Sequence, residues 1–192
     1  MVHAAGRVPD LEPLDLAAAG VASEKGRLKL NEFLQSVSNP GVYAVGDAAM
    51  NGPPLTPIAS LDAEIAAANM LEGNHRKADY LGVASVCFTE PPIASVGLSE
   101  AQARENGLKF RTKCEKASDW YTARRVAETT SGFKVLVENE TDRILGAHLV
   151  GPHVDEVINI FALAIRKGLT TKDLKTTLFA YPTGASDISS ML

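Results

Sequence analysis

The sequence has no long apolar run and no cluster of basic residues. No apolar stretch approaches the roughly 20 residues of a membrane-spanning helix, and the net charge is −4 over 192 residues. Lysine and arginine are scattered along the chain, which argues against a nucleic-acid partner. No signal peptide is visible. We therefore expect a cytoplasmic protein without a membrane or nucleic-acid partner.

Cysteine is scarce, since only Cys87 and Cys114 are present. Two unmatched cysteines are typical of reduced thiols in the cytoplasm, and we expect each to be a small buried hydrophobic residue rather than a nucleophile. His148 and His153 have no carboxylate or cysteine at ligand spacing, so we expect no metal site. Gly-x-Gly-x-x-Gly is also missing, which excludes the dinucleotide-binding turn that this motif forms.

The most informative segment that is present runs from Val42 to Ala49. Its first four residues predict a short buried strand that stops at Gly46-Asp47. Ligands of open α/β sheets bind just beyond the carboxyl ends of strands. Gly46 would let a ligand approach the backbone, and Asp47 offers two acceptor oxygens to a hydroxyl group. The alternative is that Gly-Asp simply begins a turn.

A helix is predicted after this segment, with Thr56 as its N-cap, Pro57 as its first residue and Gly73 as its stop. An apolar stripe at helical spacing supports it. The stripe consists of Ile58, Leu61, Ile65, Ala68 and Leu71. A helix that begins beside a ligand points free N–H groups and its positive dipole end at that ligand.

Beyond a polar link near residues 73–77, short strands and helices alternate. The predicted strands cover residues 84–88, 93–97, 108–114, 124–129, 133–137 and 144–150. Three helices are predicted in this part of the chain. The first begins at a capping box of Ser99 and Gln102 and ends at Gly107, the second covers residues 154–167, and the third is capped by Thr170. This layout predicts an α+β fold in which helices cover one face of an antiparallel sheet. Ile160 and Leu163 lie off the main apolar stripe of the helix at 154–167, either as ordinary surface residues or at an interface.

Five motifs in this order resemble the pyridine nucleotide–disulfide oxidoreductases, the family of glutathione reductase, dihydrolipoamide dehydrogenase and mercuric reductase. They lie at residues 5–10, at 43–48 with 55–57, and at 88–100, 146–152 and 181–183. The resemblance implies that residues 1–77 are the C-terminal segment of an α/β FAD-binding domain and that residues 78–192 are a dimerisation domain with an isologous two-fold interface. The motifs would cover less than half of a family member, so we expect Met1 to begin a truncated chain.

The resemblance also implies the cofactors. FAD would be bound by Gly46, Asp47, Ala48, Leu55, Thr56 and Pro57. Asp47 would hold the ribityl chain, and the helix start would stabilise negative charge on the reduced isoalloxazine. In the full-length parent, NAD(P)H would reduce this FAD. Because the Gly-rich turn is missing, we expect the chain alone to bind FAD weakly and to be inactive.

The catalytic residues implied by the resemblance lie in the C-terminal loop. Family members that act on disulfides have His-Pro-Thr-x-x-Glu there, whereas this chain has Tyr181 at the His position, Ser186 at the Glu position and Asp187 next to it. A phenol is a poor base at pH 7 but a good hydrogen-bond donor. Mercuric reductases resemble this pattern in using tyrosine, but they end in a cysteine pair that this chain lacks. The alternative is that Tyr181 only packs.

Three functions remain open at this point. The first is the C-terminal portion of a dimeric FAD-dependent oxidoreductase that reduces a disulfide or another two-electron acceptor and serves cell redox homeostasis. The second is a dimerisation module without a ligand. The third is a flavoprotein that reduces a quinone-like acceptor. We expect Arg124 and Arg125 to be a solvated pair rather than an anion site.

Overall fold

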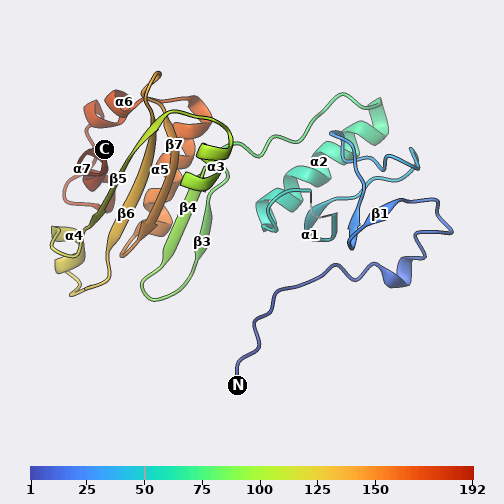
Figure 1. Cartoon of the computed structure of the whole chain (residues 1–192), viewed down its shortest axis with the longest axis horizontal. Helices are drawn as coiled ribbons and strands as arrows, with labels where there is room; N and C mark the ends of the chain where they lie inside the picture. Colours follow the sequence, from blue (N-terminus) through green and yellow to red (C-terminus); the bar gives the residue numbers. More distant parts are fainter. Residues whose placement is uncertain (50) are drawn as a thin grey trace. The chain divides into compact units, whose positions relative to one another are not determined.

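The computed structural model describes residues 1–49 and 51–192 and divides the chain into two compact units. Unit 1 comprises Met1–Tyr80 and unit 2 comprises Leu81–Leu192 (Figure 1). Within the described residues, no helix combines the length and the apolar character needed to cross a membrane.

Unit 1 has little regular structure apart from one long helix. A 3-10 turn, η1 (Glu12–Leu14), is followed by a short antiparallel hairpin of β1 (Ser23–Glu24) and β2 (Arg27–Leu28). Lys25 and Gly26 form the hairpin turn with positive φ angles of 52° and 72°. A small core of Leu34, Ile65 and Ala66 holds this unit together.

The predicted buried strand at residues 42–45 is wrong. Within the described part of the chain, this segment pairs only with the residues just before it, through a bridge between Gln35 and Tyr43. Helix α1 (Gly46–Ala49) begins directly afterwards. A strand of an open α/β sheet is buried by flanking strands and helices, and with pairing on one side only, Val45 remains 37% exposed.

Helix α2 (Thr56–Glu72) begins one residue earlier than predicted, because Leu55 and not Thr56 is its N-cap. The extended backbone of Leu55 presents its carbonyl to the N–H groups of Ile58 at 2.9 Å and Ala59 at 3.1 Å. No side chain of the described residues caps this end of the helix. The predicted stop is confirmed, since Gly73 is the C-cap with a φ of +81°.

The predicted apolar stripe of α2 is only partly buried. Ile58 and Ile65 are buried, but Leu71 is 85% exposed. Asp62 and Asn69, each 1% exposed, lie on the buried face instead. Asn69 lies there because its side chain bonds four main-chain groups, the carbonyls of Phe33 and Arg76 and the N–H groups of His75 and Arg76.

Unit 2 is built on a five-stranded antiparallel sheet with strand order β3-β4-β7-β6-β5. The strands are β3 (Ser85–Cys87), β4 (Ile93–Gly97), β5 (Phe110–Lys116), β6 (Gly132–Glu138) and β7 (Ile144–Val150). The helical segments are α3 (Glu100–Glu105), α4 (Tyr121–Arg124), α5 (Val154–Lys167), α6 (Thr171–Thr176), η2 (Gly184–Asp187) and α7 (Ile188–Met191).

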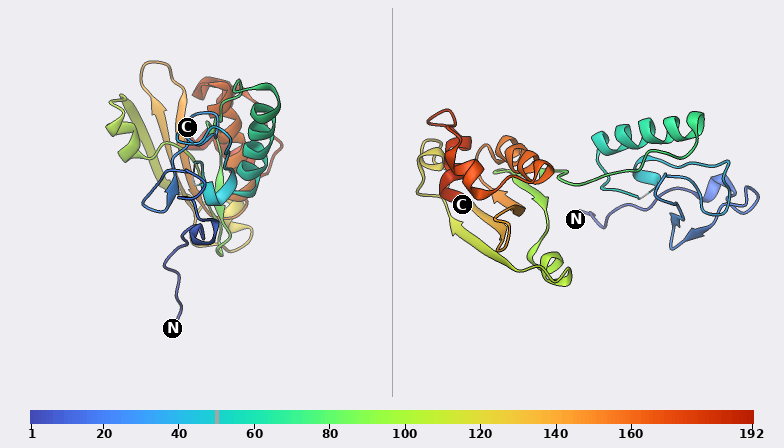
Figure 2. Two further views of the ribbon diagram at one scale, coloured as in Figure 1. Left: turned by 90° about the vertical axis from the view of Figure 1, so that its right-hand side faces the viewer. Right: turned by 90° about the horizontal axis from the view of Figure 1, so that it is seen from above.

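The sheet lies between α5 on one face and α3 on the other (Figure 2). Phe133, Val135 and Val137 of β6 alternate into the core beneath α5, as their spacing predicts. Phe161 and Ile158 of α5 are fully buried against them. The predicted α+β fold, an antiparallel sheet covered by helices, is therefore confirmed.

In unit 2, the predicted helices and strands agree with the structure where the sequence has a strong N-cap or a clear alternation of apolar residues. Strands 93–97 and 144–150 and helix 154–167 have the predicted bounds. The predicted capping box of Ser99 and Gln102 forms, and the predicted N-cap Thr170 forms a capping box with Asp173. Strand β5 lies two residues later than the predicted range of 108–114.

The predicted strand at 124–129 is wrong, because the short helix α4 ends at Arg124 and residues 125–127 form a turn directly after it. The N–H groups of Arg124 and Arg125 bond back to the carbonyls of Trp120 and Tyr121, each at 2.9 Å. Trp120 packs on Phe133 with ring centroids 5.4 Å apart. Anchoring of Trp120 in the core thus places the start of α4, a tertiary effect that overrides local strand propensity.

Both cysteines are exposed, so the expectation that they are buried is wrong. Cys87 lies on β3 and Cys114 on β5. These are the two edge strands of the sheet, where fewer neighbours cover a side chain.

Candidate functional site

The first candidate site surrounds the Gly46-Asp47 turn of unit 1. Gly46 has a φ of +69°, and a Cβ on it would lie 3.3 Å from the Cβ of Ala59 on α2. Glycine is required by this left-handed backbone and by the close approach of α2. The turn leaves Asp47 exposed at the start of α1.

A cavity of about 620 Å³ opens beside Asp47. Its walls carry two cations and one anion together with a mainly apolar surface. The lining residues are Arg7, Val8, Pro9, Arg27, Asp47, Ala48, Gly52 and Pro54. Guanidinium groups bind phosphates and carboxylates through paired N–H donors, and a carboxylate accepts bonds from hydroxyl groups.

The structure brings only some of the predicted cofactor residues to this cavity. Asp47 and Ala48 line it, whereas Gly46, Leu55 and the Thr56-Pro57 helix start do not. Arg27 and Gly52 were missed by sequence reasoning. Arg27 lies in a two-residue strand without a recognisable pattern. The Gly52-Pro53-Pro54 run just after Asp47 was the available signal for Gly52.

The second candidate site is the C-terminal loop of unit 2. Tyr181 is 84% exposed. Thr183 and Ser186 form a reciprocal capping box around η2, and the Thr183 hydroxyl donates to the carbonyl of Ala180 at 2.6 Å. The Ser186 hydroxyl donates to the carbonyl of Thr183 at 2.6 Å. Ser186 therefore shapes the loop rather than pairing with Tyr181.

Asp187 ties the end of this loop to α4. The Thr122 hydroxyl donates to Asp187 Oδ2 at 2.5 Å. Burial raises the pKa of Asp187 above its ordinary value, and the hydrogen bond from Thr122 opposes this shift. Asp187 thus points to α4 and anchors the loop.

The raised pKa of Asp187 predicts a pH-dependent cost to stability. Ionisation is harder in the folded state, so the free energy of unfolding falls as pH rises from the unfolded pKa through the folded one. Asp187→Asn keeps an acceptor for Thr122 without the charge. We expect this variant to be more stable than the parent at pH 7, and the gain to vanish in acid. Urea unfolding between pH 3 and 7 checks this, and a gain that persists at pH 3 would contradict it.

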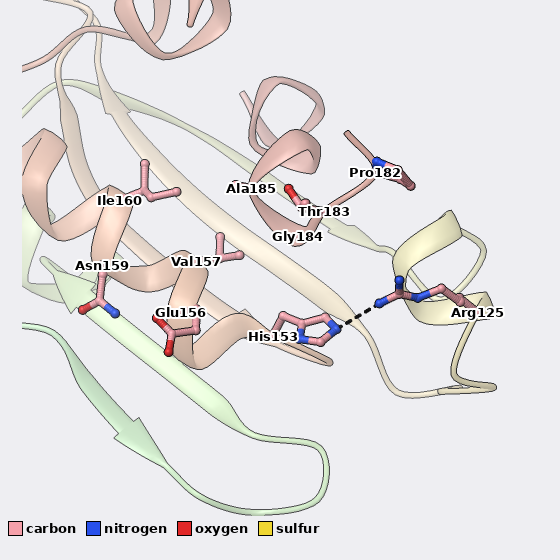
Figure 3. A pocket seen from close by; sticks show the side chains of 10 residues that line it. All are labelled: Arg125, His153, Glu156, Val157, Asn159, Ile160, Pro182, Thr183, Gly184 and Ala185. Carbon is pink, nitrogen blue, oxygen red and sulfur yellow. Dashed lines mark hydrogen bonds between the residues drawn. The ribbon is translucent and has the colours of Figure 1, made fainter. Parts of the chain in front are cut away.

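A second cavity, of about 610 Å³, lies between α5 and the C-terminal loop (Figure 3). Val157 and Ile160 of α5 face Pro182 and Ala185 of the loop across it. Arg125 lies at one end, where its Nη2 is 3.5 Å from Nε2 of His153. Arg124 and Arg125 are both exposed. The exposure of Arg124 and Arg125 agrees with a solvated pair and does not by itself indicate a bound anion.

Sequence profiles assign both units to one family. The profile described as "Pyridine nucleotide-disulphide oxidoreductase, dimerisation domain" matches residues 83–192. A second profile, "Pyridine nucleotide-disulphide oxidoreductase", matches residues 1–63.

Individual relatives agree with these profiles. The chain is 48% identical over 180 residues to an uncharacterized 19.7 kDa protein in a mercuric resistance operon of Staphylococcus aureus, covering 93% of this chain and 100% of that protein. It is 37% identical to mercuric reductase of Lysinibacillus sphaericus, covering 98% of this chain and 34% of the reductase. It is 38% identical to dihydrolipoyl dehydrogenase of Staphylococcus aureus, covering 93% of this chain and 38% of that enzyme. The chain thus spans about a third of these two enzymes.

The fold is also similar to that of a solved flavoprotein disulfide reductase. The Cu(II) complex of the HOCl-induced flavoprotein disulfide reductase RclA from Escherichia coli matches with a TM-score of 0.85 at 29% identity. The match covers 98% of this chain and 43% of RclA. The profiles, the relatives and the fold agree, and the chain belongs to the pyridine nucleotide–disulphide oxidoreductase family.

Proposed function

We propose that the chain is the C-terminal portion of a dimeric, FAD-dependent NAD(P)H oxidoreductase that reduces a disulfide or another two-electron acceptor. Residues 1–77 act as the end of its FAD-binding domain and residues 78–192 as its dimerisation domain. The observation that carries the proposal is the cavity beside Asp47, since it places the acidic residue of the flavin-like motif on one wall with Arg7 and Arg27.

The residues around this cavity suit a flavin dinucleotide. Asp47 accepts bonds from ribityl hydroxyl groups, and Arg7 and Arg27 offer donors to phosphate oxygens. The positive end of α2, at Thr56 and Pro57, favours negative charge nearby. Ala48 lines the same cavity, whereas Gly46 and Leu55, which the motif also predicts, lie outside its lining and hold the turn and the start of α2. When bound, FAD would supply the two-electron chemistry that links hydride transfer from NAD(P)H to reduction of the acceptor.

The C-terminal loop supplies the acceptor side of the proposed reaction. Tyr181 is exposed and free to donate a hydrogen bond from its hydroxyl group. Ser186 and Asp187 hold the loop that carries it. We assign Tyr181 the role of donor and the other two residues a positioning role, in a cytoplasmic homodimer formed through residues 78–192.

A second candidate function is a dimerisation module that binds no cofactor. It is favoured by the 19.7 kDa relative from a mercuric resistance operon, because the chain spans that whole protein. In this case residues 78–192 pair and the cavity beside Asp47 takes no ligand.

FAD titration of the purified chain tests the first candidate. Because the Gly-rich turn of the cofactor site is missing, we expect weak binding, with a Kd on the order of 0.1–1 mM. Asp47→Ala should weaken it roughly 10- to 100-fold, the usual effect of losing a hydrogen bond to a charged group. Amide NMR shifts of Asp47, Ala48 and Gly52 report the binding.

Asp119→Ala is the matched control, since Asp119 is an exposed aspartate of unit 2. We expect this variant to bind FAD as the parent does. Equal weakening by both substitutions would refute a flavin site at Asp47. A dimer that shows no FAD shifts at millimolar concentration would favour the second candidate.

A further inference from the structure

Asp62 is a buried carboxylate in the middle of α2, where its side chain is 1% exposed. Its Oδ1 accepts a hydrogen bond from the Tyr80 hydroxyl at 2.8 Å. Its Oδ2 is buried and has no hydrogen-bond partner within residues 1–49 and 51–192. Burying a polar oxygen without a hydrogen-bond partner is costly. Packing of α2 alone therefore does not explain an aspartate at this position.

Asn69, on the same face of α2, is a buried polar residue whose hydrogen bonds are all structural, and it provides a comparison for Asp62. Both Asn69 and Asp62 are 1% exposed. The amide of Asn69 is fully used, since it bonds the four main-chain groups described above. Among the residues that the structure describes, the Asp62 side chain makes a single hydrogen bond, and that bond leads to Tyr80 rather than to the main chain.

Tyr80 connects Asp62 to the segment after α1. Its hydroxyl oxygen accepts a bond from Asn51 Nδ2 at 3.0 Å. Its ring lies directly over Gly52, where a Cβ would fall 2.8 Å from the ring's Cζ. Burial, and then the hydrogen bond to Asp62, raise the pKa of Tyr80 to about 12. The hydroxyl therefore stays protonated at neutral pH and keeps its proton for the bond to Asp62.

Gly52 and Pro54 line the same cavity as Asp47 and Ala48. The series Asp62–Tyr80–Asn51 thus runs from the rigid middle of α2 to one wall of the candidate cofactor site. We propose that Asp62 and Tyr80 are positioning residues, which hold the segment Asn51–Pro54 in place as the wall of this cavity. We call the series of hydrogen bonds Asp62–Tyr80–Asn51 the tether. Its effect on flavin binding rests on the proposed function, whereas its effect on the segment Asn51–Pro54 does not.

Tyr80→Phe is the direct test, because it keeps the ring over Gly52 and removes the hydroxyl that joins Asp62 to Asn51. In the ligand-free protein, we expect faster hydrogen exchange at the Gly52 amide and shifted amide resonances of Asp47 and Ala48. FAD binding should weaken about 3- to 10-fold, the usual effect of one neutral hydrogen bond. Asp62→Asn keeps an acceptor for Tyr80 and should bind FAD within about twofold of the parent.

Tyr43→Phe is the matched control in the same unit. It removes a hydroxyl that also makes two bonds, to Asn74 Oδ1 at 2.7 Å and from Gln35 Nε2 at 3.1 Å, away from the cavity lining. We expect a lowered Tm without a change in Gly52 exchange or FAD affinity. If Tyr80→Phe does not fold, Asn51→Ala cuts the other end of the series and is expected to give the same result.

The outcomes separate the tether from the flavin site. Unchanged Gly52 exchange and cavity resonances in Tyr80→Phe, or equal changes in Tyr43→Phe, would overturn the positioning role. If the parent chain shows no FAD shifts, the proposed flavin site fails, while the ligand-free exchange data still decide whether the tether exists.

Discussion

Replacing Phe161 with alanine is expected to lower the free energy of unfolding of unit 2 by about 3–5 kcal/mol. Phe161 is 0% exposed and lies in the core between α5 and the sheet. Its removal loses both buried apolar area and packing contacts, because the surrounding strands cannot collapse into the space. Urea unfolding followed by circular dichroism measures the change.

Phe88→Ala is the matched control for this variant. Phe88 is 86% exposed, so the same chemical change should alter the free energy of unfolding by less than about 0.5 kcal/mol. A loss of similar size in both variants would show that α5 is not the centre of the core. A loss below about 1 kcal/mol for Phe161→Ala would contradict the packing seen in the structure.

The second large effect is expected at Leu163, two positions along the same helix. Leu163 is 55% exposed, and its half-buried neighbour Ile160 borders the cavity beneath the C-terminal loop. In the proposed homodimer this face of α5 is buried by the partner. Leu163→Glu would place a charge in that interface and should raise the dimer dissociation constant at least about 30-fold, which corresponds to about 2 kcal/mol.

Leu71→Glu provides the comparison, because Leu71 is an exposed leucine near the end of α2 in unit 1. Sedimentation velocity over a dilution series should show Leu163→Glu dissociating at a concentration at least about 30-fold higher than the parent chain, and Leu71→Glu dissociating as the parent does. A parent chain that sediments only as monomer would refute the proposed dimer. A Leu163→Glu variant with the dissociation constant of the parent would place the interface on another face.

Much of unit 2 could be predicted from the sequence because its signals are local. The alternation of Phe133, Val135 and Val137 marks the core face of β6, and Ser99 and Thr170 mark helix starts by their capping boxes. Gly168 ends α5 in the left-handed conformation that favours glycine. Each of these signals depends on residues within one or two helical turns or strand repeats.

The failures have tertiary causes. A run such as residues 42–45 is apolar enough for a buried strand, but a strand also needs neighbours, and no local pattern reveals whether they are present. Trp120 directs the chain into α4 through its contact with Phe133, which lies in another element. Such contacts override propensity and cannot be read from a short window.

In the candidate site, too, residues in contiguous motifs could be predicted, whereas residues joined by tertiary contacts could not. Asp47 and the loop around Tyr181 follow from motifs that are contiguous in sequence. The Asp62–Tyr80–Asn51 series does not, since its two bonds join residues separated by 18 and 29 positions. Asp62 also interrupts a helix face that reads as apolar, and it was overlooked for this reason.

The strand order of unit 2 has a consequence for how the chain folds. Strands β5, β6 and β7 pair with their neighbours in sequence, and so do β3 and β4. The pairing of β4 with β7, which joins Ile93 to Val150 at one end, is the long-range step. Closing a long loop costs entropy before any contact repays it, and non-local pairing slows folding. During synthesis, the β3–β4 hairpin must therefore wait until residue 150 has emerged before β7 can pair along the free edge of β4.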